Sequence, residues 1–115
     1  MSRLSKNFDR TEFECKCQCG TDTVDAELIR MLQDVRDKFG PIKINSGVRC
    51  VEHNKKEGGA KHSQHLKGRA ADIVPLNATI AEVWNYINST YPACGLGLYS
   101  SFIHVDSRGS KARWG

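Results

Sequence analysis

The hydrophobic residues between positions 24 and 39 recur at the spacing of one face of a helix. They fall every three to four positions, at Leu28, Leu32, Val35 and Phe39. This period predicts an amphipathic helix, and the Gly-Pro pair at 40–41 predicts its abrupt end. A second helix is expected over residues 79–91, because Thr79 and Glu82 have the spacing of a capping box.

Four shorter segments have the pattern of β-strands. They cover residues 42–45, 70–74, 95–99 and 102–106. Only Ser100 and Ser101 separate the last two, so we expect these to form a hairpin. The order of the elements predicts an α+β fold, in which helices pack on one face of a small antiparallel sheet.

The segment from residue 47 to residue 69 shows neither period and is rich in glycine, lysine, histidine and asparagine. We expect a long structured loop with one helical turn near residues 51–55. A loop of this length in a small domain is usually functional. Residues 1–23 are expected to form an irregular or short-helical arm, anchored by Phe8 and Phe13.

The length of 115 residues predicts a single domain over 1–115, with the N-terminal arm of residues 1–23 packed on it. The net charge of +4 is mild, and no run of lysine or arginine forms a basic stripe. This charge suits attraction to an anionic polymer such as a bacterial wall and does not indicate nucleic acid as a partner. No coiled-coil pattern indicates assembly, and we expect a monomer.

The first ten residues, MSRLSKNFDR, lack the apolar core of a signal peptide. No stretch approaches the roughly 18 apolar residues that are needed to cross a membrane. We therefore expect that the protein is made in the cytoplasm without a signal peptide and has no membrane partner.

The chain has five cysteines, and a cytoplasmic setting disfavours structural disulfides between them. They are Cys15, Cys17, Cys19, Cys50 and Cys94. One interpretation is a second structural metal site that uses Cys15, Cys17 or Cys19 together with Cys50. The usual Cys-x-x-Cys spacing of zinc knuckles is absent, and we favour the simpler interpretation of small buried or half-buried thiols.

Two histidines and an aspartate have the chemistry and the placement of a catalytic zinc site. Such a site needs about three protein ligands, commonly histidine nitrogens and a carboxylate oxygen, and one open position. His65 ends the long loop, Asp72 lies in the next predicted strand, and His104 lies in the last one. Ligands on neighbouring strands of one sheet can converge on a point. Asp106 shares a strand face with His104, because side chains alternate along a strand.

Three motifs in this order resemble the M15 metallopeptidases, the group of D-Ala-D-Ala carboxypeptidases and bacteriophage endolysins. Residues 63–72 match the family signature SxHxxGxAxD. Residues 46–54, SGVRCVEHN, are similar to the SGYR-x-x-EHN segment of one phage and bacterial branch. Residues 104–106 and 112–114 resemble the end of that branch, so the likeness runs from about Phe8 to the C-terminus.

The resemblance implies a fold like that of the hedgehog domain and D-Ala-D-Ala carboxypeptidases. It implies one catalytic Zn²⁺ with His65, Asp72 and His104 as its ligands. Arg49 would contact a carboxylate of the substrate, because a planar guanidinium can bind two oxygens at once. The reaction would be hydrolysis of an amide bond in the peptidoglycan stem peptide.

The sequence departs from the family at the position of the general base. Many members have an acidic residue three positions before the last histidine ligand, where this chain has Ser101. We predict that Asp106 is the catalytic base instead. Two alternatives stay open: Asp106 orients His104 without taking the proton, or another residue supplies the base.

Two functions remain open from the sequence. The first is a zinc-dependent peptidoglycan peptidase, either an endopeptidase or a D,D-carboxypeptidase. A phage endolysin or tail-associated lysin fits the missing signal peptide, since it reaches the cell wall after release or on a virion. The second is a non-hydrolytic, zinc-containing module that binds the wall or a protein.

Overall fold

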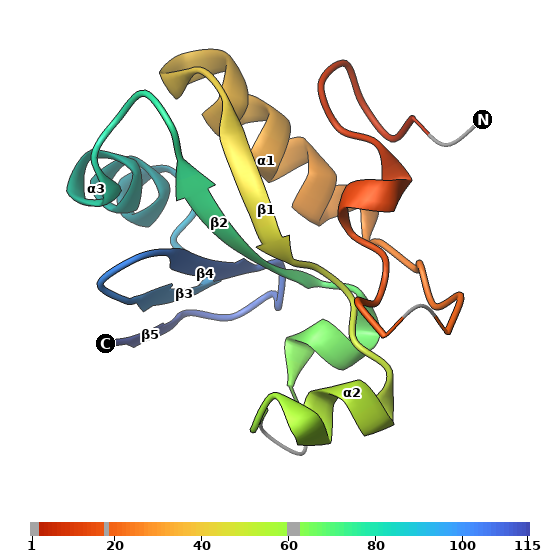
Figure 1. Ribbon diagram of the computed structural model, residues 1–115. Helices are drawn as coiled ribbons and strands as arrows, with labels where there is room; N and C mark the ends of the chain where they lie inside the picture. Colours follow the sequence, from red (N-terminus) through yellow and green to blue (C-terminus); the bar gives the residue numbers. More distant parts are fainter. Residues whose placement is uncertain (1–2, 18, 60–62) are drawn as a thin grey trace.

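A five-stranded sheet with the strand order β1-β2-β4-β3-β5 lies at the centre of the fold (Figure 1). The computed structural model describes residues 3–17, 19–59 and 63–115, so small parts of the predicted arm and loop lie outside the described residues. The strands are β1 (Ile42–Ser46), β2 (Ala70–Pro75), β3 (Gly95–Leu98), β4 (Ile103–Asp106) and β5 (Ala112–Trp114). The first four pair with their neighbours in antiparallel fashion, as the sequence predicts.

The last strand, β5, was not predicted and pairs with β3 in parallel. The sheet is therefore mixed rather than purely antiparallel. Three residues are too few to show a period, and β5 is held by its pairing with an existing edge rather than by a hydrophobic pattern of its own. The predicted α+β class is confirmed, with this one addition.

The predicted helices are present with small changes at their ends. They are α1 (Ala26–Phe39) and α3 (Ile80–Thr90). The side chain of Asp25 caps α1 by accepting a hydrogen bond from the Leu28 amide. Thr79 and Glu82 form the expected capping box at the start of α3. None of the helices in the described part of the chain is long and apolar enough to cross a membrane.

The long loop contains two short helical segments, and one of them was predicted. Helix α2 (Val51–Lys56) confirms the expected turn. A 3₁₀-helix, η2 (Gln64–Lys67), directly precedes β2. Between them the loop spans residues 60–62, which lie outside the described part of the chain.

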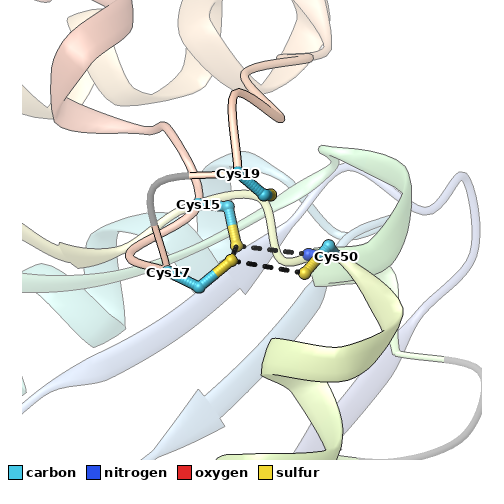
Figure 2. Close-up of side chains that lie close together, drawn as sticks. All are labelled: Cys15, Cys17, Cys19 and Cys50. Atoms are coloured by element: carbon cyan, nitrogen blue, oxygen red, sulfur yellow. Dashed lines mark hydrogen bonds between the residues drawn. The ribbon is translucent and has the colours of Figure 1, made fainter.

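The N-terminal arm packs through its two predicted anchors. Phe8 and Phe13 are buried, with their rings in edge-to-face contact and a centroid distance of 5.8 Å. The arm includes a 3₁₀-helix, η1 (Arg10–Glu12), and the backbone oxygen of Phe13 accepts a hydrogen bond of 2.9 Å from Val48 N–H. Beyond Phe13, three cysteines of the arm meet Cys50 at the start of α2 (Figure 2).

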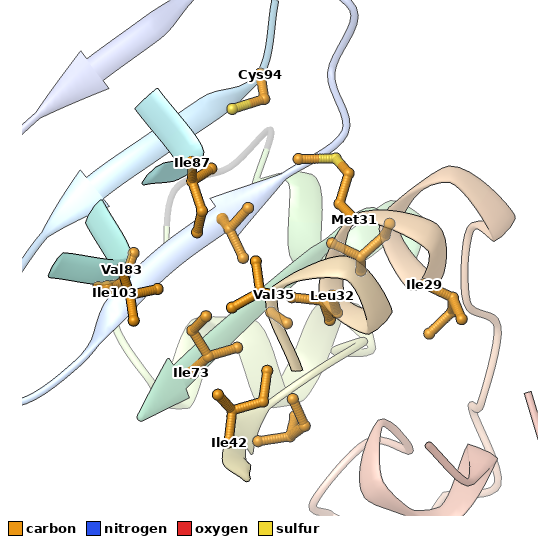
Figure 3. Packing of buried hydrophobic residues seen from close by; sticks show 14 of the residues in the cluster. Ile29, Met31, Leu32, Val35, Ile42, Ile73, Val83, Ile87, Cys94 and Ile103 are labelled. Atoms are coloured by element: carbon orange, nitrogen blue, oxygen red, sulfur yellow. The ribbon is translucent and has the colours of Figure 1, made fainter. Parts of the chain in front are cut away.

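Helices α1 and α3 cover one face of the sheet and form the core with it (Figure 3). Residues of both helices, such as Val35 and Ile87, pack against strand residues such as Ile73 and Ile103. Side chains alternate along a strand, so the neighbours of these apolar residues point to the opposite face. The residues predicted to bind metal lie on that opposite face.

Candidate metal centre

Asp72 and His104 are direct partners across the sheet, on neighbouring strands β2 and β4. His65 approaches them from η2. Asp72 Oδ1 lies 3.3 Å from His65 Nε2 and 3.3 Å from His104 Nδ1. All three residues are buried, and their candidate ligand atoms lie within 4.8 Å of one another. They form a group that could hold a metal ion.

The signature residues around His65 shape the turn that aims its ring at the sheet. The Ser63 hydroxyl accepts a hydrogen bond of 3.1 Å from His65 N–H and so caps η2. Gly68 ends η2 in the left-handed conformation, with φ of +68°. A Cβ at Gly68 would also overlap the backbone of Thr23. Both features favour glycine at this position, so Ser63 and Gly68 each have a role in the local geometry of the motif.

The far nitrogen of each histidine is held by an acceptor. His65 Nδ1 lies 2.6 Å from the backbone oxygen of Gly47, and His104 Nε2 lies 2.8 Å from Asp106 Oδ2. A carbonyl oxygen only accepts, so His65 Nδ1 carries the proton of this hydrogen bond. The opposite nitrogens are then free to bind metal, which is the usual arrangement of histidine ligands in zinc sites.

The charge of Asp72 suits the same role. Burial raises its pKa, but His104 and His65, which can donate hydrogen bonds to Asp72 when no metal is bound, outweigh burial and hold the pKa well below its usual range. Asp72 is therefore an anionic oxygen donor between two imidazole nitrogens. Two histidine nitrogens and one carboxylate oxygen form a donor set typical of catalytic zinc.

Arg49 contacts the other oxygen of the same aspartate. Its Nη2 lies 3.3 Å from Asp72 Oδ2, its Nε donates to Ser46 Oγ at 3.2 Å, and its Nη1 donates to Asn54 Oδ1 at 3.3 Å. These contacts hold the guanidinium directly beside the candidate ligands. The predicted contact between Arg49 and a substrate stays a prediction.

Asp106 is fully buried, with both carboxylate oxygens engaged. Oδ1 accepts from Gly95 N–H and from the Arg108 backbone and Nε, and Oδ2 accepts from Arg108 Nη2 at 2.8 Å and contacts His104. Burial raises the pKa of Asp106, and hydrogen bonds from His104 and Arg108 lower it well below its usual range. A Cβ at Gly95 would overlap this carboxylate, so the glycine provides its space.

The three candidate ligands line a cavity of about 500 Å³. Tyr99, Phe102 and Trp114 form one side of this cavity, which we call the aromatic wall. Tyr99 and Phe102 stack with a centroid distance of 4.4 Å, and Trp114 Nε1 donates to the Tyr99 hydroxyl at 3.0 Å. The Trp114 ring lies 4.9 Å from the His104 ring. It reaches His104 across Gly97, where a Cβ would overlap the indole.

The cavity also has polar walls, which differ in charge. Arg49 and Arg108 line it, and the Arg108 guanidinium lies 5.3 Å from the centre of the Trp114 ring. Glu57 and Asp72 are the two carboxylates among the described lining residues. Glu57, at the end of α2, is exposed.

A family model described as peptidase M15 matches residues 6–106. The chain belongs to the M15 peptidase family. Membership implies peptidase activity, and the family consists of zinc peptidases. A comparison with curated proteins finds no match.

In this M15 peptidase the five residues selected from the sequence lie around one point. They are Arg49, His65, Asp72, His104 and Asp106. The sequence analysis did not select Arg108, Trp114 or Glu57, which also line the cavity. For Arg108 the signal that could have found it is its position two residues beyond Asp106 on an extended segment, which places both side chains on one face.

Proposed function

We propose that this M15 peptidase is a zinc-dependent peptidoglycan hydrolase that cleaves an amide bond of the stem peptide, as an endopeptidase or a D,D-carboxypeptidase. The observation that carries the proposal is the convergence of His65, Asp72 and His104 at the floor of an open cavity. Both histidines have their far nitrogens held, so the ligand atoms are oriented in advance.

One zinc ion would be bound by His65 Nε2, Asp72 and His104 Nδ1. When bound, it would supply Lewis acidity towards the scissile carbonyl and the attacking water. The protein's own contribution is to orient these donors and to hold the substrate beside them.

The two arginines in the cavity support a substrate with free carboxylates. Stem peptides carry such groups, and a guanidinium can bind both oxygens of one carboxylate. Arg49 is already oriented by Ser46 and Asn54, so substrate binding would cost it little side-chain entropy. Arg49 therefore remains our candidate for substrate binding, with the added role of holding Asp72.

The aromatic wall supports a peptide of extended shape. Tyr99, Phe102 and Trp114 present flat apolar surfaces close to His104. Such surfaces can pack against the peptide and exclude water from the reacting bond.

For Asp106, the contacts support the orienting role rather than the role of base. A general base needs a free lone pair within hydrogen-bond reach of the water. Both oxygens of Asp106 already accept hydrogen bonds, and the residue is completely buried. We assign Asp106 the task of holding His104 in the tautomer that binds metal through Nδ1.

We assign the transfer of the water proton to Glu57. It lines the cavity as a carboxylate, is exposed, and could accept a proton and return it to the leaving amine. Asp72, the other carboxylate among the described lining residues, is engaged by both histidines and Arg49.

A second candidate function is a zinc-containing module that binds the wall or a protein without hydrolysis. The observation that favours it is Ser101, at the position where many relatives have their acidic residue, because a serine there cannot serve as the base. In either case we infer that the protein acts on the wall, in a setting such as that of a phage endolysin or a tail-associated lysin.

Purified protein incubated with isolated cell walls separates the two functions. The peptidase should release new amino groups, a chelator should stop the release, and added zinc should restore it. Binding to the walls with no release at any zinc concentration would support the module and contradict the peptidase.

A further inference from the structure

Four of the five cysteines gather in one cluster outside the candidate active site (Figure 2). We name it the cysteine cluster; it consists of Cys15, Cys17, Cys19 and Cys50. Three of these residues come from the N-terminal arm, and Cys50 caps α2 from a position 31 residues later than Cys19. The fifth, Cys94, lies in the hydrophobic core with Ile87 and Met31 (Figure 3).

The sulfur atoms of the cysteine cluster lie at the spacing of ligands to one metal ion. Cys17 Sγ is 3.3 Å from Cys15 Sγ and 3.5 Å from Cys50 Sγ, and all four sulfurs lie within 4.8 Å of one another. Sulfur ligands at about 2.3 Å from a tetrahedral zinc ion lie about 3.8 Å apart. A disulfide bond would require about 2.05 Å, and the cysteines are free thiols.

We propose that the cysteine cluster is a second zinc site, in which four thiolates bind one Zn²⁺ ion in a closed tetrahedral arrangement. The ion replaces the four thiol protons, and no residue is oxidised or reduced. Four soft sulfur donors select zinc over magnesium or calcium, which prefer oxygen. With no position left for water, the site would be structural.

Backbone N–H groups around the cysteine cluster donate hydrogen bonds to its sulfur atoms and so favour their thiolate form. Cys50 N–H donates to Cys15 Sγ at 3.4 Å, and His53 N–H donates to Cys50 Sγ at 3.4 Å. Hydrogen bonds of this kind stabilise the negative charge of metal-bound sulfur. Cys17 and Cys19 are exposed, so zinc can reach the cluster from solvent. The favoured sequence interpretation, separate buried or half-buried thiols, does not fit these two residues.

The proposed ion would join the N-terminal arm to residues 47–50, the segment that holds His65 of the candidate active site. Cys50 directly follows Arg49, whose backbone N–H donates to the His65 oxygen at 2.9 Å. In the same segment, the Gly47 oxygen holds His65 Nδ1. A Cβ at Gly47 would overlap the Phe13 backbone, so the arm and this segment are already in close contact. This supporting role rests on the proposed function of the first site, whereas the existence of the second site does not.

Metal analysis of the purified full chain, with loosely bound ions removed, tests the proposal. We expect two zinc ions per chain in the wild type and in the control Cys94→Ser. We expect one in the double variant Cys17→Ser/Cys19→Ser and one in the double variant His65→Ala/His104→Ala. Because Cys17 and Cys19 are exposed, their replacement should leave the fold intact, which circular dichroism would check.

Cobalt substitution gives a readout that does not depend on activity. Cobalt bound to thiolates has a strong sulfur-to-metal charge-transfer absorption. This absorption should persist in His65→Ala/His104→Ala and be lost in Cys17→Ser/Cys19→Ser. A wild-type protein without this absorption, whose zinc content is unchanged by the cysteine substitutions, would overturn the second site. Loss of hydrolysis with both ions still bound would count against the proposed function alone.

Discussion

His104 Nε2 lies 2.8 Å from Asp106 Oδ2, two residues further along the same strand. Asp106 in turn is paired with Arg108 through two hydrogen bonds of 2.8 Å. This chain of contacts orients the candidate ligand atom His104 Nδ1 from behind. The last residue of the His-Val-Asp strand, Asp106, therefore orients the candidate ligand His104 without binding the metal itself.

The first prediction concerns Asp106→Asn. We expect zinc affinity to fall about 10- to 100-fold, because the partner that orients a histidine ligand is weakened. Turnover at saturating zinc should then recover to near the wild-type value. Isothermal titration with zinc and assays across a zinc series measure both quantities. Full zinc affinity with no turnover at any zinc concentration would instead make Asp106 the base.

The second prediction concerns Glu57→Gln. We expect zinc binding to be unchanged and kcat to fall roughly 10²- to 10⁴-fold, the usual contribution of a general base. Glu52→Gln is the matched control, because Glu52 is an exposed carboxylate on the same helix outside the described cavity lining. Equal kcat in the two variants would remove Glu57 from the mechanism.

The third prediction concerns Arg49→Lys, which keeps the charge and removes the planar fork. The wild-type side chain contacts three partners, and a lysine cannot reach all of them at once. Loss of one hydrogen bond to a charged group costs about 1.5–3 kcal/mol, so kcat/KM should fall roughly 10- to 100-fold. Arg30→Lys serves as the control, because Arg30 is exposed. An unchanged kcat/KM in Arg49→Lys would rule out a role for the planar guanidinium of Arg49.

The fourth prediction concerns the aromatic wall. Gly97→Ala should displace Trp114, because the new methyl group would overlap the indole, and overpacking costs about 1–3 kcal/mol of unfolding free energy. Gly109→Ala is the control, since no atom lies within 4 Å of a Cβ there. Thermal melts and Trp114 fluorescence in a Trp84→Phe background measure the effect. Identical spectra and melting temperatures in both variants would contradict the close packing of Trp114 over Gly97.

The sequence predicts those parts of the fold that depend on local pattern. The period of Leu28, Leu32 and Val35 identifies α1, and the capping box at Thr79 identifies the start of α3. The motif around His65 is also readable, because its residues shape the local backbone: Ser63 caps η2 and Gly68 ends it. Such signals are readable because cause and effect lie within a few residues.

Features that depend on long-range pairing could not be predicted in this way. Strand β5 forms because it pairs with β3, and only that register brings Trp114 beside His104. The cysteine cluster likewise depends on the arm folding back to Cys50. The spacing of residues along the chain does not reveal these contacts. The four cysteines meet in space although the sequence has no Cys-x-x-Cys motif.

The central claim is that zinc held by His65, Asp72 and His104 enables hydrolysis of the stem peptide. Mass analysis of fragments from purified peptidoglycan tests it most directly, because new termini identify the cleaved bond. We predict defined stem-peptide products from the zinc-loaded wild type, and none from the metal-free protein or from His104→Ala. The same products in equal yield from either of those two samples, or no products from the zinc-loaded wild type, would contradict the account.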